Sequence, residues 1–540
     1  PRTTSAAPAA FELVQATDLP QEIQRRLLTL IEQTRLGADE QREIARELVS
    51  HAFDALEAGV PGAEVLVELD DPGQIPQLYS RATKRKRPLA YQLRRWIFQG
   101  LLATLAIALL VYAGLAIRFY AGAPRIRNDY LAQLNAPILA TPESDRAWPV
   151  YQQALFEWFR VESALLERSA RDLDAADPLR SYAGVEAIPH IPADHPDRPD
   201  VVREMERFRP MLDRVIDATR RPIVGMVISH ETRLLPVPGA DRAIAVNKLP
   251  QARPAEQAPL ISAEAPHLRH ARLLARLLAF DAILSCEQHN PDRAVEVFCA
   301  MIRLSDQIHT EPFLMGGMVS LAIHNYALEN LHQVLADNPD LFDSEHCRRL
   351  AATVRAARAT TRSFDLHNER AVFLDILQRA FTDDGRGGGR LTPAGVRLIN
   401  SIAEAPLEFG FRSDADNSWI QRSGYHAVAP IAGATVADRG RQLHVFSVLL
   451  DQVSAALDTG PEGVRDLTLW IETQFKPIRS TSRPRWTPLI ELTPSYSRLV
   501  TDTFHARALA DTTNTLLALF IYRHEHDAWP DSLEQTLGPD

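Results

Sequence analysis

The chain has 540 residues, of which 46% are hydrophobic and 24% are charged, as in ordinary globular proteins. This length predicts several domains with a large buried core, which excludes wholesale disorder. The formal net charge of −10 gives no electrostatic basis for binding nucleic acid. The three cysteines, Cys286, Cys299 and Cys347, are too few for a disulfide-built scaffold or a four-thiolate zinc site.

The segment before the first long apolar run is expected to be helical. Residues 1–19 are rich in Ala, Pro and Thr and predict a leader without fixed structure. Residues 20–85 predict a three-helix cytoplasmic module. The first helix has apolar residues at helical spacing, the second runs from about Ala38 to Gly59, and the third stops before Asp71-Pro72.

A group of residues within this module carries a resemblance to a known family. They are Glu47-Leu48, His51, Asp54-Ala55-Leu56, Gly59 and Asp71-Pro72. The segment resembles the helical prefix domains of the HAAS or permease-prefix type, which precede membrane spans in bacterial proteins. The resemblance implies a cytoplasmic regulatory or interaction module rather than an enzyme. Such prefixes usually precede several spans, whereas this sequence has one apolar run of that length.

Residues 96–117 predict a transmembrane helix. This run, WIFQGLLATLAIALLVYAGLAI, contains no charged residue, and a helix of its length rises about 33 Å, enough to cross a hydrocarbon core of about 30 Å. Buried helices of soluble proteins rarely run this long without a charge. A cleaved signal peptide is not expected either, because the run begins far from the first residue.

The charges on either side of the span predict its orientation. Residues 81–95 contain seven basic residues and no acid, including the basic juxtamembrane segment 86–95, whereas the other flank offers only a few arginines. The positive-inside rule therefore places the N-terminus in the cytoplasm and residues 125–540 outside it, across the inner (plasma) membrane. The lipid bilayer is thus a predicted partner. The basic run either sets topology alone or also touches anionic headgroups.

Residues 125–540 predict an all-α extracytoplasmic domain, an irregular array of helix hairpins. The predicted helices are 147–171, 200–219, 264–288, 291–309, 313–336, 343–362, 364–382, 393–405, 439–457, 461–475 and 498–525. Asn290-Pro291 predicts an N-cap that separates two antiparallel helices. Prolines are frequent in residues 172–260, which we interpret as a loop-rich insertion capping the helical body. Residues 383–390, DDGRGGGR, predict a flexible linker.

The C-terminal stretch carries a second, shorter resemblance. A helix from Ala518 to His526 leads into Trp529-Pro530-Asp531-Ser532-Leu533. This pattern resembles one in helical membrane-anchored bacterial proteins and in pilin-like secretion subunits, where a glycine stands at the position of Asp527. The likeness is short, so no pilus function is carried over.

No residue is predicted to be catalytic, cofactor-binding or metal-ligating, and no cofactor is predicted. The motifs HExxH, GxSxG and Ser-x-x-Lys are absent. His524 and His526 would point about 200° apart on a helix. His267 and His270 share a helix face, but spacing supplies no third ligand, and we expect both on the surface. Cys286 and Cys299 are left open between a disulfide and two buried thiols.

The preferred hypothesis is a membrane-anchored scaffold or sensor. It would bind a protein partner of unknown identity outside the cytoplasm and tether or signal inside, without nucleic acid. The alternative is an extracytoplasmic hydrolase with a site in the insertion, which requires His190, His195 or His230 to converge with a carboxylate in one cleft; Asp194 lies between the first two. A secretion-associated accessory protein is a third hypothesis.

Overall fold

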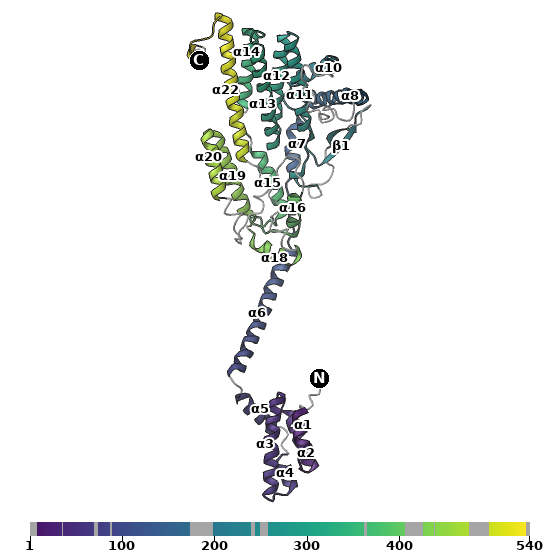
Figure 1. Cartoon of the computed structure of the whole chain (residues 1–540), viewed down its shortest axis with the longest axis vertical. Helices are drawn as coiled ribbons and strands as arrows, with labels where there is room; N and C mark the ends of the chain where they lie inside the picture. The colour runs from purple at the N-terminus through teal and green to yellow at the C-terminus, as the bar shows by residue number, and fades with distance from the viewer. Residues whose placement is uncertain are drawn as a thin grey trace. The chain divides into compact units, whose positions relative to one another are not determined.

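The computed structural model describes residues 8–535 except 35, 70–73, 87–88, 173–197, 239–242, 249–256, 361–363, 365, 405–424, 437 and 475–495. This part of the chain contains 19 α-helices and one two-stranded sheet, which confirms the predicted, mostly helical fold (Figure 1). The chain divides into two compact units, Pro1–Val111 and Tyr112–Asp540, called unit 1 and unit 2 below.

Unit 1 is a small helical module with its own core. Its helices are α1 (Pro8–Gln15), α2 (Gln21–Gln33), α3 (Ala38–Glu57), α4 (Gly62–Glu68) and α5 (Gln74–Lys86). Leu27, Leu30 and Ile31 of α2 are buried against Ile44 and Leu48 of α3. The predicted end of the second helix is also observed, because Gly59 has a φ of 84°, which favours glycine.

The module is larger than the predicted three helices. Helix α1 forms within the segment expected to be a leader, and Ala10 and Val14 on it are completely buried in the unit 1 core. These two residues are spaced i, i+4 and so lie on one helix face. Two apolar positions in so short a segment were too weak a signal to separate a packed helix from a loose leader.

Helix α6 (Leu89–Tyr120) contains the predicted span. An 18-residue window of its segment Trp96–Tyr120 has a mean hydropathy of 2.3, and none of that window is buried inside the structure. By length and composition it can cross a membrane, and among the described residues it is the one helix that meets these criteria. It differs from a core helix, whose apolar side chains would be covered by protein.

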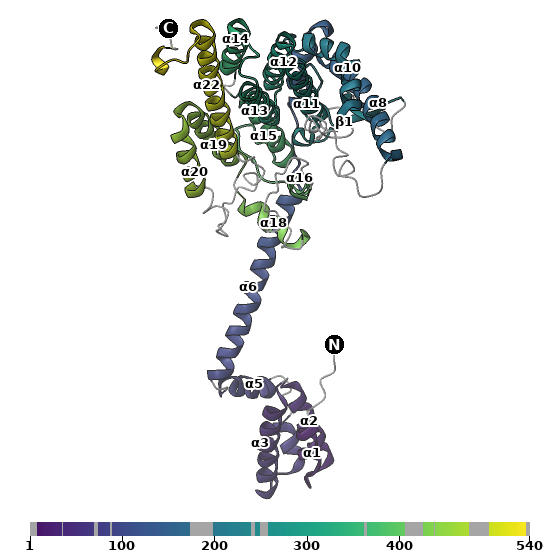
Figure 2. The same ribbon diagram turned by 45° about the horizontal axis from the view of Figure 1, so that its top comes forward.

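Unit 2 contains a first core built from packed helices. They are α8 (Trp148–Asp172), α10 (Arg198–Ala218), α11 (Pro266–Glu287), α12 (Pro291–His309), α13 (Leu314–Asp337) and α14 (Ser344–Thr360). The predicted turn between α11 and α12 is observed, with the Asn290 side chain accepting a hydrogen bond from the Arg293 backbone and Pro291 in the first turn. Helices α11, α12 and α13 lie side by side in chain order, whereas α14 packs against α12 (Figure 2).

A second core lies beside the first within unit 2. It involves α15 (His367–Ala380), α16 (Pro393–Glu404), α19 (Arg439–Thr459) and α20 (Pro461–Gln474), together with Phe119 near the end of α6. Helix α7 (Tyr130–Ala140) and helix α18 (Tyr425–Thr435) were not predicted. The 31-residue α22 (Tyr496–His526) joins the two cores, since Leu499 and Val500 belong to the second and Leu517 and Phe520 to the first.

The region interpreted as an insertion, 172–260, contributes to the main core. Met205, Phe208 and Leu212 of α10 are buried against the helical body, so α10 is part of that body rather than a cap upon it. The region also holds a hairpin that the sequence analysis missed, β1 (Glu231–Pro236) paired antiparallel with β2 (Ala243–Lys248). Short 3₁₀ turns occur at Glu143–Asp145, Leu260–Ser262 and Leu533–Gln535.

The glycine-rich segment expected to be a flexible linker is a closed loop. Phe381 pairs with Leu391 across its base. Asp384 Oδ1 accepts hydrogen bonds from the backbone N–H groups of Arg386 (2.8 Å) and Gly388 (2.9 Å). Such side-chain to backbone bonds fix a tight turn. We call residues 382–390 the glycine loop.

Candidate functional site

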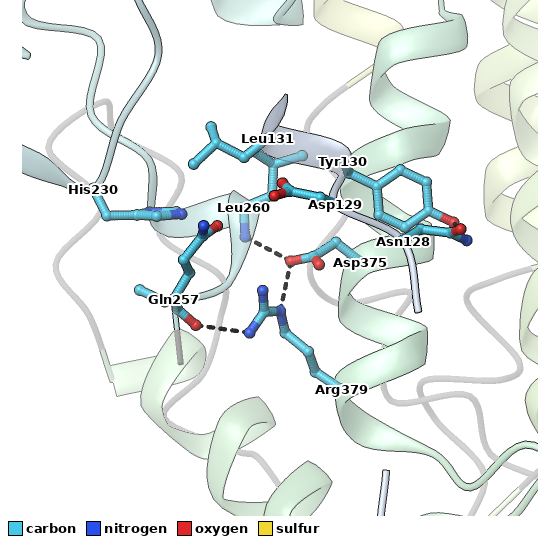
Figure 3. Close-up of a pocket in the computed structure, with 10 residues that line it drawn as sticks. Asn128, Asp129, Tyr130, Leu131, His230, Gln257, Leu260, Asp375 and Arg379 are labelled. Atoms are coloured by element: carbon cyan, nitrogen blue, oxygen red, sulfur yellow. Dashed lines mark hydrogen bonds and ion pairs between the residues drawn. The ribbon is translucent and has the colours of Figure 1, made fainter. Parts of the chain in front are cut away.

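A polar crevice in unit 2 brings together the start of α7, the residue before β1, the segment before the 3₁₀ turn at Leu260–Ser262, and α15. Its lining includes Asp129, His230, Gln257, Asp375 and Arg379 (Figure 3). His230 is the histidine of the hydrolase alternative that lies among the described residues, and two carboxylates line the same crevice. His190, Asp194 and His195 lie outside the described residues.

Both oxygens of the Asp375 carboxylate accept hydrogen bonds from the surrounding protein. Its Oδ2 atom accepts hydrogen bonds from the Leu260 backbone N–H at 2.7 Å and from Arg379 Nε at 2.8 Å, and Oδ1 accepts from Gln378 Nε2 at 2.9 Å. The residue is 2% exposed. A buried carboxylate is stable in the fold only when it is paired in this way. Asp375 therefore attaches the Leu260 segment to α15.

Neighbouring side chains of α15 extend the same attachment. Arg379 Nη1 donates to the Gln257 carbonyl at 2.7 Å. Gln378 Oε1 accepts from the backbone N–H groups of Arg127 and Asn128, both at 3.2 Å. One turn of α15 thus holds two chain segments that are distant in sequence. These side chains of α15 hold backbone segments in place, and the hydrogen bonds described here are made to other groups of the protein.

His230 is the least constrained group of the crevice. The side chain is half-buried, and its Nδ1 atom is buried without a hydrogen-bond partner in the described part of the chain. Burial lowers the pKa of His230, an effect that the backbone of Ser262 opposes. The ring is therefore neutral near pH 7, with one nitrogen able to meet a further polar group.

The crevice is small for a substrate site. Its empty volume of about 190 Å³ includes open solvent, whereas pockets for small molecules typically enclose about 300–1,000 Å³. No hydrogen bond or ion pair links His230 to Asp375 or Asp129 among the described residues. With both oxygens of Asp375 engaged, the described geometry lacks the histidine–carboxylate pair that the hydrolase hypothesis requires.

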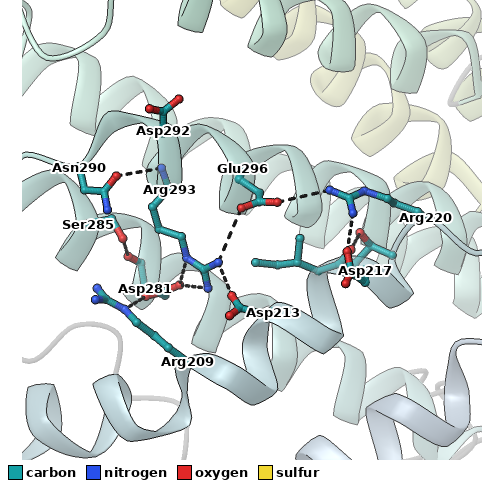
Figure 4. A network of polar contacts seen from close by, with 12 residues as sticks. Arg209, Asp213, Asp217, Arg220, Asp281, Ser285, Asn290, Asp292, Arg293 and Glu296 are labelled. Atoms are coloured by element: carbon teal, nitrogen blue, oxygen red, sulfur yellow. Dashed lines mark hydrogen bonds and ion pairs between the residues drawn. The ribbon is translucent and has the colours of Figure 1, made fainter.

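A second polar cluster lies where α10, α11 and α12 meet (Figure 4). Asp281 on α11 is completely buried. Its Oδ1 atom lies 2.9 Å from Arg209 Nε, and its Oδ2 atom lies 2.8 Å from Arg293 Nη2. Arg293 also pairs with Asp213 of α10. Charges of both signs alternate through the cluster, so each neutralises the next. It joins three helices.

The structure corrects the expected position of His267 and His270. Both are buried, 2% and 8% exposed, rather than on the surface. His267 Nε2 lies 3.1 Å from Glu311 Oε2, while burial holds the pKa of His270 at about 4. Trp148 packs beside both rings. No group of three or more metal-ligating side chains occurs in the described parts of the chain, this pair included.

The remaining candidates are also separate from one another. His526 stacks on Tyr522 with ring centroids 4.0 Å apart, and its Nδ1 atom lies 3.0 Å from the Tyr522 carbonyl oxygen. Cys286, Cys299 and Cys347 are free and buried, which resolves the open alternative in favour of buried thiols. Burial raises the pKa of Cys286 and of Cys347 to about 12, so neither is a nucleophile near neutral pH.

Three polar residues of unit 2, Asp306, Asp375 and Arg379, were not predicted from the sequence. Burial raises the pKa of Asp306 to about 7, and its Oδ1 atom is buried without a hydrogen-bond partner in the described structure. Asp375 and Arg379 could have been noticed as an i, i+4 charge pair within an apolar helix. Their partners Leu260 and Gln257 lie more than a hundred residues away in the sequence, so residue spacing could not predict these contacts.

Comparison with known proteins finds no matching family model, no matching curated protein and no matching solved structure.

Proposed function

We propose that the chain is a membrane-anchored scaffold or sensor that binds a protein partner outside the cytoplasm and tethers or signals inside. The observation that carries the proposal is the uncovered apolar segment of α6 between two units that each have a hydrophobic core. A helix of this length and composition is stable in a bilayer. Folded units on both sides are what a tether requires.

The proposed orientation rests on the flanking charges. Seven basic residues precede the span within residues 81–95, which favours the helices of unit 1 before the span in the cytoplasm and residues 125–540 outside. The resemblance of residues 20–85 to prefix modules agrees with a cytoplasmic interaction role for unit 1. A bacterial inner membrane is the proposed location.

The hydrolase alternative has less support from the described geometry. It would need His230 to act with a carboxylate of the crevice, but Asp375 is engaged by three donors. A binding function needs no such pair.

The proposal is tested by affinity purification of the intact protein from detergent-solubilised native membranes, followed by mass spectrometry. A variant lacking residues 1–85 is the matched control. We expect a stoichiometric partner that is retained by this variant, because recognition is proposed to lie in unit 2, and a second partner that is lost with unit 1. Recovery of the chain in the soluble fraction after alkaline extraction of the membranes would contradict the anchor, and absence of any partner would contradict the scaffold.

A further inference from the structure

Helix α18, Tyr425–Thr435, differs from the other helices of unit 2 in composition and place. Its sequence, YHAVAPIAGAT, contains no Asp, Glu, Lys or Arg. It lies beside the end of α6 at which the chain enters unit 2, in both views (Figures 1 and 2). With 11 residues it is about 16 Å long, too short to cross a bilayer itself.

Close packing attaches α18 to the last turn of α6. Phe119 is 5% exposed and belongs to the second core of unit 2. A Cβ atom added at Gly433 would lie 2.6 Å from Phe119 Cδ2, so only glycine permits this approach. The neighbouring Ile117 and Tyr120 remain exposed. The packing fixes α18 at the depth where the apolar segment of α6 ends.

An apolar side chain of α18 remains uncovered at this depth. Ile431 is 45% exposed, and it lies two residues from Gly433, therefore on the opposite side of the helix. A helix is about 10 Å in diameter, which keeps Ile431 within about that distance of Phe119. The headgroup region on each side of a bilayer is roughly 5–8 Å thick. Ile431 thus lies within about one helix diameter of the end of the apolar segment, next to the headgroup layer if α6 spans.

The glycine loop adds positive charge to the same end of unit 2. A Cβ atom at Gly122, directly after α6, would be 3.5 Å from Thr382 Cγ2 at the start of the loop. Arg118, Arg125 and Arg386 are exposed here. Exposed arginines are attracted to phosphate groups.

One of the two acidic residues of the loop, Asp383, is paired with arginines of the protein. Asp383 lies 3.0 Å from Arg439 Nη1 and 3.5 Å from Arg127 Nη1. Hydrogen bonding to the Gly385 backbone and the nearby arginines hold the pKa of Asp383 below its usual value. Asp384 uses Oδ1 to accept the backbone N–H groups of the loop. The three exposed arginines, Arg118, Arg125 and Arg386, therefore outnumber the exposed acid of the loop, Asp384.

We propose that α18 and the glycine loop form a lipid-contact surface that rests on the anionic headgroup layer of the bilayer. Ile431 enters the apolar boundary of that layer, and Arg118, Arg125 and Arg386 contact lipid phosphates. The proposal rests on the proposed membrane anchor, because α6 must span for this surface to reach lipid.

The test uses the full chain in nanodiscs of phosphatidylethanolamine and phosphatidylglycerol. A photoreactive benzophenone amino acid replaces one exposed residue at a time, and mass spectrometry counts lipid adducts after illumination. The three positions are Ile431, Leu105 in the middle of the span (58% exposed) and Leu533 (53% exposed). Leu533 follows the end of α22, which lies away from α18 within unit 2 (Figures 1 and 2). Unchanged circular dichroism melting establishes that each variant is folded.

We expect adducts at Leu105 and Ile431 and only background at Leu533. In the Ile431 variant, Arg386→Glu should lower the share of phosphatidylglycerol among the adducts several-fold. Adducts at Leu105 with only background at Ile431 would overturn the lipid-contact surface and leave the anchor intact. Background at Leu105 would overturn the anchor and the surface together. Equal adducts at all three positions would mean non-specific lipid contact and would also overturn the proposal.

Discussion

Asp281 lies completely buried between Arg209 and Arg293, and removing its charge should be costly. Removing one partner of a buried ion pair leaves the opposite charge uncompensated, which typically lowers the free energy of unfolding by about 3–5 kcal/mol. Both arginines reach partly to solvent, so we expect Asp281→Asn to lower the free energy of unfolding of unit 2 by about 2–3 kcal/mol. Denaturant titration of the detergent-solubilised chain measures the change.

The matched control is Asp217→Asn. Asp217 pairs with Arg220 at the surface, with its side chain 70% exposed, and such pairs contribute about 0–1 kcal/mol. Equal losses in the two variants would show that the buried cluster has no special role in joining α10, α11 and α12.

His324 predicts a pH dependence of stability. The side chain is completely buried on α13, and burial lowers its pKa to about 4. The ring is neutral in the fold, whereas the unfolded chain takes up a proton below about pH 6.5. Its contribution to stability is therefore complete above about pH 6.5 and is lost as the pH falls towards 4.

His324→Leu removes this ionisation at similar volume. The difference in free energy of unfolding between the variant and the unchanged chain should shift in favour of the variant by on the order of 2 kcal/mol as the pH falls from 7 to 4.5. His270 keeps its own pKa of about 4 in both proteins, so its effect cancels in the difference. Denaturant titrations at several pH values measure the gain, and parallel curves for the two proteins would contradict it.

At the scale of the element, Gly395 controls the contact between α16 and the preceding helix. A Cβ atom there would collide with the Ala380 carbonyl oxygen. Because the obstacle is backbone, we expect Gly395→Ala to lower the free energy of unfolding by about 1–3 kcal/mol. Ser401→Ala, at an exposed position of the same helix, should change it by less than about 0.5 kcal/mol. Thermal melts of both variants measure these changes, and equal stability losses in the two would contradict the prediction.

The elements that were predictable from the sequence have strong local signals. Helix α12 begins and ends at the predicted residues because Asn290-Pro291 caps it and apolar residues recur along one face. The β1–β2 hairpin was missed because β1, ETRLLP, has little alternation and ends in proline. The crevice was predictable only through His230. Its other charged groups meet through long-range contacts that no local pattern encodes.

At the scale of the whole molecule, the two units should unfold separately. Each has its own core, and the chain divides at Val111 and Tyr112. Leu27 is completely buried in unit 1, so Leu27→Ala should destabilise that unit by about 2–5 kcal/mol. Hydrogen exchange of the full chain should show faster exchange in α2 and α3 and unchanged exchange in α11 to α14. A parallel change in both sets would contradict independent units.

The three cysteines have a practical consequence beyond the question of pairing. Cys286, Cys299 and Cys347 belong to α11, α12 and α14, and all are buried. A thiol reagent can reach them only when these helices separate. The rate at which the reagent modifies the cysteines therefore measures how often the helix bundle opens. The same concealment leaves an engineered surface cysteine as the sole fast-reacting thiol. The native cysteines therefore report on opening of the helix bundle, and one cysteine added at the surface can be labelled selectively.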